Sequence, residues 1–282
     1  KVTVVRMYGG ESFKIQPDHI FFDALTDIAI LKIDGYNNFT SIVPKKGNSD
    51  KVKVGEGVFA LGNPLGLFDM SFEPTATKGI LSGKNIDFGL DEDFGSVYKD
   101  MLQTDASINP GNSGGPLLNR DGSVIGINTF VITGSEDYKG SVGLSFAIPI
   151  NRAIEIVKDL KEFGKIDRRH VTGIEIGDIP EGLKKFLQAE GADENVIIKD
   201  IEKKSAGEKS GLKIGDFILE VNGRKINSVK DYNNAILEDE MKTGDFITLR
   251  IRRKENDEVN DNIKILEKVI NLELEKGKFN DW

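Results

Sequence analysis

The sequence predicts a mainly β chain with two domains, and three observations support this. Short apolar runs rich in β-branched residues recur through the first part of the chain, bounded by Gly, Asn or Pro. One helical pattern follows, from Arg152 to about Phe163. After it, strand patterns alternate with a second, capped helix, and this change in the pattern of secondary structure indicates a second domain. The expected boundaries are 1–165 for the first domain, 166–270 for the second and 271–282 for a tail or linker.

The first 62 residues read as strands separated by turns. The expected strands are Val2–Met7, Ser12–Ile20, Ile28–Ile33 and Val58–Leu61, with a strand and turn at Lys51–Gly57. Lys84–Lys99 is polar, acidic and rich in Gly, so we expect a surface loop there. Its acidic residues lack the ordered spacing of a calcium loop, so the sequence predicts no metal and no other cofactor.

The first domain is expected to end in two strands and a helix. Val124–Thr129 and Ser145–Pro149 read as the strands, with a loop at Ile132–Val142 between them. Asn151 is expected to cap the helix and Gly164 to end it. The apolar face expected on this helix consists of Ala153, Ile154, Val157 and Leu160.

Composition excludes several classes of protein. The 46 acidic and 38 basic residues give a net charge of −8, which argues against nucleic acid as the main partner. No apolar run approaches the roughly 18–20 residues that span a bilayer, so no membrane span is predicted. The chain has no cysteine, which excludes disulfides and thiolate metal sites.

One polar loop, Thr104–Leu117, carries the strongest chemical signal. Its glycines permit backbone angles that other residues avoid, so the loop can turn sharply and push Ser113 outward. Such a turn also aims successive backbone N–H groups at one point, where an oxyanion could form. For the Gly-x-Ser-Gly unit alone, a Gly-rich hairpin turn is an equally good interpretation.

The whole fourteen-residue string closely resembles the signature of the trypsin-like HtrA/Deg family of serine proteases. The resemblance implies a chymotrypsin/trypsin-like double β-barrel followed by a PDZ domain. It also implies that Ser113 is the nucleophile, and that the N–H groups of Gly111 and Ser113, with Asn112 between them, form the oxyanion hole. Secreted digestive relatives carry an Asp at the position of Asn112, so activation by cleavage of the N-terminus is not expected here.

Thr26–Lys32 resembles the family's string around the catalytic aspartate, which implies that Asp27 orients the histidine; a turn Asp that caps a strand is the other interpretation. Gly62–Gly66 and Thr77–Ser82 also fit the family, where they would end the first barrel and open the second. The resemblance further implies a pocket for the substrate side chain. Its expected lining is apolar and uncharged, which favours small or medium aliphatic residues: Ile108, Ile127, Asn128 and Val131.

The second domain carries a string from Ser205 to Gly223 that resembles a PDZ domain of the circularly permuted HtrA type. The resemblance implies a loop whose N–H groups hold a terminal carboxylate, followed by a strand that adds the ligand to its sheet. A helix that starts at the capping residue Ser228 would form the other wall of the groove. The expected peptide-binding residues are Val171, Thr172, Gly173, Ile174, Ile176, Val229 and Tyr232, with Asn233.

Serine acyl transfer needs a general base, and the chain has only two histidines, His19 and His170. Neither lies in a matching motif, so both are interpreted as bystanders. In the family the histidine precedes the strand that matches Val2–Met7, so we expect it upstream of Lys1, together with two strands of the first barrel. Whether the 282 residues are active by themselves stays open at this point.

Two functions follow from the resemblance. The first is an ATP-independent serine endopeptidase of the HtrA type that acts on misfolded or unfolded proteins, with a PDZ domain that binds C-terminal peptides and regulates the enzyme. The second is a catalytically inactive, protease-like scaffold or chaperone that binds peptides through its PDZ groove. The resemblance also implies a homo-oligomer, a trimer or a multiple of it, in the bacterial periplasm or cell envelope.

Overall fold

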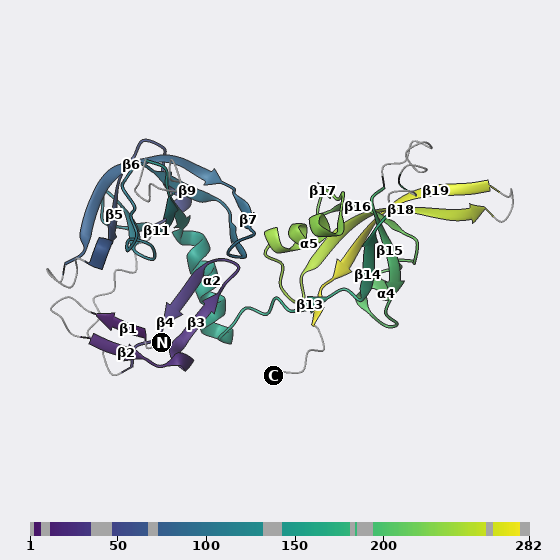
Figure 1. The fold of residues 1–282 in the computed structure, drawn as a ribbon, viewed down its shortest axis with the longest axis horizontal. Coiled ribbons are helices and arrows are strands. Elements are labelled where there is room, and N and C mark those ends of the chain that lie inside the picture. Colours follow the sequence, from purple (N-terminus) through teal and green to yellow (C-terminus); the bar gives the residue numbers. More distant parts are fainter. Residues whose placement is uncertain are drawn as a thin grey trace. The chain divides into compact units, whose positions relative to one another are not determined.

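The protein is described here by a computed structural model that divides into two compact units, Lys1–Ile166 and Asp167–Trp282 (Figure 1). The described residues are 3–6, 12–34, 47–66, 73–131, 143–180, 184, 194–257 and 262–276. No helix within these ranges is both long enough and apolar enough to cross a membrane.

A closed barrel dominates the first unit, with strand order β10-β11-β12-β9-β6-β5. Its strands are β5 (Gly57–Gly62), β6 (Thr75–Ile86), β9 (Met101–Thr104), β10 (Pro116–Asn119), β11 (Val124–Val131) and β12 (Ser145–Pro149). Inward-facing apolar side chains that alternate along the strands fill the interior, and the largest of them are fully buried. They include Leu81, Leu102, Leu117 and Ile125.

The remaining strands of this unit form antiparallel pairs. β1 (Thr3–Arg6) pairs with β2 (Ser12–Ile15), β3 (Ile20–Asp23) with β4 (Ile28–Leu31), and β7 (Gly89–Asp91) with β8 (Ser96–Tyr98). Short 3-10 helices lie at Pro17–His19, Ser49–Lys51 and Pro64–Gly66. Within the described residues, β5 is therefore the first strand of the closed barrel, and β1 to β4 lie outside it.

Three expectations for this unit were wrong. Gly62–Gly66 was expected to end the first barrel, yet Gly62 is the last residue of β5, which pairs with β6 and β10 in the closed barrel. Lys51–Gly57 is a 3-10 turn and a loop up to β5. Lys84–Lys99 was expected as a surface loop, but it contains the end of β6 and the β7–β8 hairpin, and all of β8 is buried.

The helix α2 (Ile150–Phe163) also differs from its sequence prediction. It begins two residues earlier than expected, with Pro149 at the N-cap, and Asn151 lies in its first turn. The Asn151 amide group donates to Asn48 Oδ1 at 2.8 Å and so ties the helix to a distant loop. Gly164 ends the helix with a φ of +72°, as predicted. The buried face contains Ile156, whereas Ile154 is 48% exposed.

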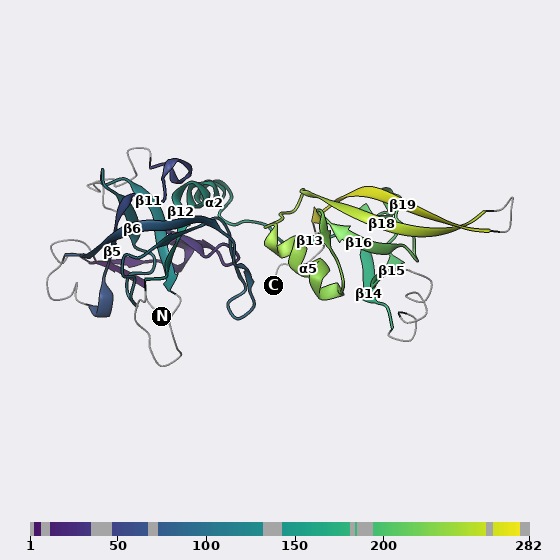
Figure 2. The ribbon, with the colours of Figure 1, turned by 90° about the horizontal axis from the view of Figure 1, so that it is seen from above.

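The second unit is built on a six-stranded antiparallel sheet with the order β14-β15-β16-β18-β19, where β17 pairs with β16. Its strands are β14 (Ile174–Asp178), β15 (Val196–Ile201), β16 (Phe217–Val221), β17 (Arg224–Lys225), β18 (Phe246–Asp257) and β19 (Asn262–Glu273). β18 and β19 form a long ladder that extends past the neighbouring strands (Figures 1 and 2). β13 (His170–Val171) pairs separately with β20 (Glu275–Lys276).

The described residues of this unit also form the helices α4 (Ala206–Lys209) and α5 (Val229–Glu238). Ser228 caps α5 as predicted, because its side chain accepts from the Asp231 N–H at 3.1 Å. Tyr232, Ala235 and Ile236 of α5 pack on the apolar face of the sheet. Leu272 and Leu274 are fully buried in the same core, so the packed unit continues beyond residue 270, where a tail or linker was expected.

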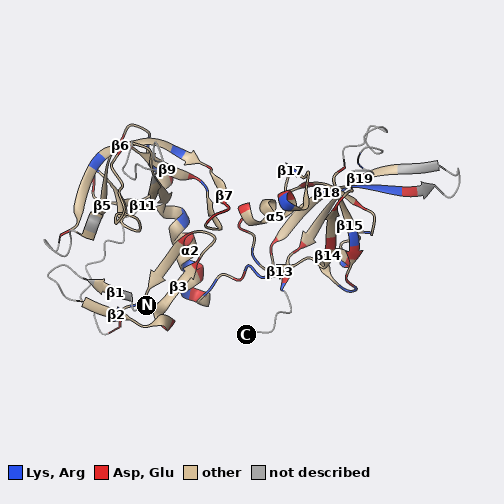
Figure 3. Cartoon of the chain, viewed as in Figure 1, with Lys and Arg blue, Asp and Glu red and all other residues tan. Residues whose placement is uncertain are grey.

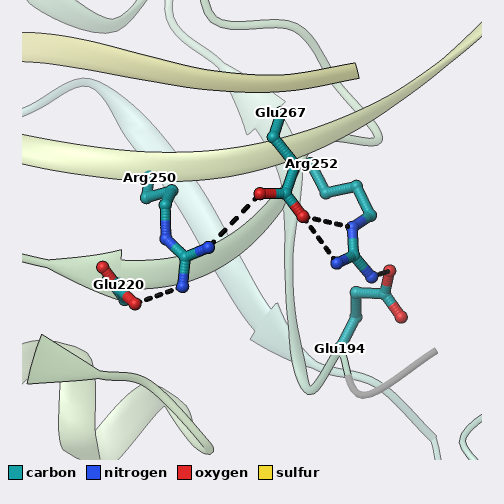
Figure 4. A network of polar contacts seen from close by, with 5 residues as sticks. All are labelled: Glu194, Glu220, Arg250, Arg252 and Glu267. Atoms are coloured by element: carbon teal, nitrogen blue, oxygen red, sulfur yellow. Dashed lines mark hydrogen bonds and ion pairs between the residues drawn. The ribbon is translucent and has the colours of Figure 1, made fainter. Parts of the chain in front are cut away.

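The strands β16, β18 and β19 carry a network of ion pairs on their side chains (Figure 4). Arg250 contacts Glu220 and Glu267, and Arg252 contacts Glu267 and the buried Glu194. Cross-strand pairs of this kind place each carboxylate beside a guanidinium and stabilise the pairing of β16, β18 and β19.

Candidate active site and peptide groove

Ser113 lies at the turn between β9 and β10, with its side chain exposed. Gly111 and Gly114, on either side of it, have φ angles of +104° and +84°, which side chains rarely adopt. The turn pushes Ser113 out of the barrel. Its Oγ donates a hydrogen bond to the carbonyl oxygen of Thr129 at 2.7 Å.

Two barrel strands hold this turn in place. The Gly114 N–H donates to the Asn128 carbonyl and the Asn128 N–H donates to the Gly115 carbonyl, each at 2.8 Å. On the other side, a Cβ added at Gly115 would lie 2.2 Å from the Leu61 carbonyl oxygen of β5. Glycine is therefore required at position 115, and the turn is fixed to the barrel directly after Ser113.

Backbone donors remain open beside Ser113. Asn112 is buried, with 1% exposure, and its N–H donates to the Asn109 carbonyl at 2.9 Å. For the N–H groups of Gly111 and Ser113, the described part of the chain offers no hydrogen-bond acceptor. Two free donors next to a serine hydroxyl are what an oxyanion hole needs.

Asp27 lies in the turn between β3 and β4, with the left-handed φ of +56° that Asp and Asn tolerate better than most residues. Its carboxylate accepts a hydrogen bond from the Tyr98 hydroxyl at 3.3 Å. Partial burial raises the pKa of Asp27, and the Tyr98 hydrogen bond opposes that rise. Burial and the nearby Asp27 charge raise the pKa of Tyr98 to about 12.

The β7–β8 hairpin supports the Asp27 turn. The Val97 N–H donates to the Leu25 carbonyl at 2.6 Å, and the Ser96 hydroxyl donates to the Ala24 carbonyl at 2.9 Å. Arg152 of α2 in turn donates to the carbonyls of Val97 and Lys99, at 2.8 and 2.7 Å. The position of Asp27 thus depends on a segment about 70 residues later in the sequence.

A cavity of about 620 Å³ connects the Asp27 turn with the strand that holds Ser113. Asp27 and Tyr98 line it on one side, and Thr129, the acceptor of the Ser113 hydroxyl, lines it on the other. The remaining lining is mostly apolar: Phe22, Asp23, Ala24, Ile28, Ala29, Phe94, Ser96 and Phe130. The predicted Asp27 therefore lines this cavity together with Thr129, and Ser113 is linked to it through the hydrogen bond to the Thr129 carbonyl.

Neither histidine lines this cavity. His19 Nδ1 lies 3.1 Å from Asp34 Oδ2, just before β3. His170 belongs to β13 of the second unit, where burial lowers its pKa. No cluster of three or more His, Asp or Glu side chains within the described ranges could hold a metal ion.

The predicted pocket for the substrate side chain differs from the structure. Ile108 and Asn128 are each only 1% exposed, so they pack inside the barrel and do not form an open wall. Ile127 packs against the cluster beneath α2. The side chain of Val131 lies outside the described part. Sequence spacing alone did not show that the side chains of Ile108 and Asn128 point into the barrel.

The second unit has a cavity of about 380 Å³ between β14 and α5. Six of the seven predicted groove residues line it, and so does Asn233: Val171, Thr172, Gly173, Ile174, Ile176 and Tyr232. Val229, the seventh, packs against the core. His170, Glu202 and Ile236 also line the cavity and were missed. Ile236 lies one helical turn after Tyr232, which is a signal that helix periodicity could have supplied.

The groove has the features that a peptide C-terminus requires. The N–H groups of Thr172 and Gly173 find no acceptor in the part of the unit that the structure describes. Asp178, at the end of β14, accepts from the Val229 N–H of α5 at 2.8 Å and so fixes one groove wall to the other. β14 is the terminal strand of the sheet order, with an edge that can accept a further strand.

Comparison with known proteins identifies both units. Residues 4–127 match the trypsin-like peptidase domain model, and residues 182–265 match the PDZ domain model. The chain is 38% identical over 259 residues to the serine protease Do-like HtrB of Bacillus subtilis, covering 90% of this chain and 54% of that protein. It is 40% identical over 215 residues to a DegP-like periplasmic serine endoprotease of Pseudomonas putida, covering 76% and 41%. The chain thus spans about half the length of these relatives.

Solved structures give the same result. The HtrA-type protease AlgW with a decapeptide matches 98% of this chain and 75% of its own, with a TM-score of 0.63 and 27% identity. The serine endoprotease from Yersinia pestis matches with a TM-score of 0.54 and the same identity. With its trypsin-like peptidase unit, its PDZ unit and these relatives, the chain belongs to the HtrA/Deg family of serine proteases.

Proposed function

We propose that the intact protein is an ATP-independent serine endopeptidase of the HtrA type that cleaves misfolded or unfolded proteins. One observation carries the proposal: Asp27 and the Thr129 carbonyl that holds Ser113 Oγ line the same cavity. In this account Ser113 is the nucleophile and Asp27 orients the base. The N–H groups of Gly111 and Ser113, which have no acceptor among the described residues, stabilise the oxyanion.

The base is proposed to be a histidine upstream of Lys1, placed in the cavity between Asp27 and Ser113. Its imidazole would accept the proton of Ser113 Oγ as that oxygen attacks the scissile carbonyl, and would return the proton to the leaving amine. Asp27 would accept from the other ring nitrogen and stabilise the imidazolium. The cavity of about 620 Å³ beside Asp27 is larger than one imidazole, so it has room for this base.

The second unit is proposed to bind C-terminal peptides and to regulate the enzyme. The open edge of β14 would add the ligand as a strand, and the N–H groups of Thr172 and Gly173 would hold its carboxylate. An assembly of three copies or a multiple of three is part of the proposal. A periplasmic or envelope location also belongs to it, supported by relatives that are named periplasmic.

Hydrolysis of unfolded casein by the intact protein tests this function. We expect cleavage without ATP and a loss of at least about 10³-fold for Ser113→Ala, because the residual rate would come from binding and the oxyanion donors alone. Ser107→Ala, an exposed serine of the same loop, is the matched control and should retain activity. Peptide binding without cleavage by the intact protein would instead support the inactive scaffold.

A further inference from the structure

The outer face of the peptide groove is acidic. Along β14, Ile174 and Ile176 pack toward the core, and Glu175 between them is exposed on the other face. Asp200 of the neighbouring β15 lies directly opposite Glu175 in the strand register, and Glu202 follows β15. Figure 3 shows acidic residues on these two strands.

These carboxylates share one hollow of about 250 Å³. Its lining also contains Gly173 and Ile174 of the predicted carboxylate loop, and Glu202 lines the main groove as well. The acidic surface is therefore continuous with the place where the last residues of a peptide would lie. Like charges directly opposite each other destabilise the pairing of two strands, so the Glu175–Asp200 pair does not stabilise the sheet. A role in binding would explain its presence.

No Lys or Arg of the described residues forms an ion pair with Glu175, Asp200 or Glu202. Lys199, Lys203 and Lys204 are next to Asp200 and Glu202 in the sequence. Lys199 directs its ammonium group over Gly177, where an added Cβ would meet Nζ at 2.0 Å, and Lys203 and Lys204 are exposed. Elsewhere in this unit, Glu194 and Glu220 each contact an arginine (Figure 4). Glu175, Asp200 and Glu202 thus form a group of carboxylates beside the groove that has no such partner among the described residues.

A peptide strand added to β14 alternates its side chains like any strand. If the last residue points inward toward Ile176 and Ile236, the penultimate residue and the fourth from the end point outward over Glu175 and Asp200. We propose that this groove selects C-terminal peptides that carry Lys or Arg at these outward positions. The inference rests on the proposed peptide-binding function and names the class of ligand.

Binding of fluorescent peptides to the 282-residue chain tests the proposal. Three peptides would end in the same apolar residue and carry Lys, Gln or Glu at the two outward positions. We expect the Lys peptide to bind roughly three- to ten-fold more tightly than the Gln peptide, and the Glu peptide more weakly than both. The preference should shrink as salt is raised, because the charges are exposed.

The double variant Glu175→Gln, Asp200→Asn should bind the three peptides alike, within about two-fold, while the Gln peptide binds as it does to the parent chain. The new asparagine side chain retains an oxygen that can accept from the Ile201 N–H, as Asp200 Oδ1 does at 2.9 Å, so the bulge is preserved. Glu155→Gln, Glu162→Gln makes the same change of charge on exposed residues of α2 and should keep the preference.

Equal binding of the three peptides by the parent chain would overturn the selectivity and leave peptide binding intact. A preference that survives in Glu175→Gln, Asp200→Asn would also overturn it, since other groups would then be responsible. If none of the three peptides binds, both the proposed peptide-binding function and this selectivity are wrong.

Discussion

At the scale of one residue, the ionised side chain of Asp27 lowers the folding stability of the protein. Its folded-state pKa is raised, so the folded protein binds this proton more tightly than the unfolded chain does. The ionised carboxylate therefore costs stability, and the cost develops as pH rises from the ordinary Asp range through the raised pKa. A carboxylate that costs stability is better explained by a role in catalysis than by a role in folding.

Asp27→Asn tests this in the 282-residue chain. Asn tolerates the φ of +56° and can still accept from the Tyr98 hydroxyl, so the change removes only the charge. We expect a higher thermal midpoint than the parent chain at neutral pH, and no difference at a pH below the ordinary Asp range, where Asp27 is protonated in both states. A lower midpoint at neutral pH would show that the carboxylate stabilises the fold.

Other residues show which features the sequence could predict. Ser228 and Gly164 were predicted correctly as helix ends, because caps are set by local backbone chemistry. Ile108 and Asn128 were expected at an open pocket and are buried in the barrel. Their burial depends on strands that are distant in the sequence, so local spacing could not show which way they point.

At the scale of elements, the strands themselves were easier to predict than their partners. The run that became β5 was recognised from its apolar residues, yet it belongs to the closed barrel. Lys84–Lys99 is polar enough to read as a loop, but Ser96–Tyr98 within it are buried against the Asp27 turn. Hydrogen bonds to Ala24 and Leu25, which local composition does not report, fix the β7–β8 hairpin there.

Arg152 provides a test of that support. Its guanidinium donates to two carbonyls at once, those of Val97 and Lys99, which a lysine ammonium cannot match with the same planar geometry. Arg152→Lys should lower the stability of the first unit by about 1–3 kcal/mol and speed amide hydrogen exchange in β8. Exchange in β8 that is as slow as in the parent chain would show that the hairpin does not depend on Arg152. Arg120→Lys, on an exposed residue, is the control.

At the scale of the whole molecule, the sequence predicted the family and the order of its two domains. The signal came from three stretches, around Ser113, around Asp27 and at Ser205–Gly223. In each of them the glycines, the apolar residues and the polar residues all match the family pattern at the same time. The structure adds what those stretches lack, the cavity that Asp27 shares with Thr129 and the acidic face beside the groove. Each of these is formed by residues from several strands, so no single motif could reveal them.

The central claim is that Ser113 of the intact protein is an activated nucleophile, and covalent labelling tests it most directly. The intact protein would be treated with an organofluorophosphate, which phosphorylates activated serines, and the adduct would be located by peptide mass spectrometry. The account predicts one adduct, on Ser113, that is absent in Ser113→Ala and strongly reduced in Asp27→Asn. An intact protein that takes up no label at Ser113, or takes it up equally well without the Asp27 carboxylate, would contradict the account.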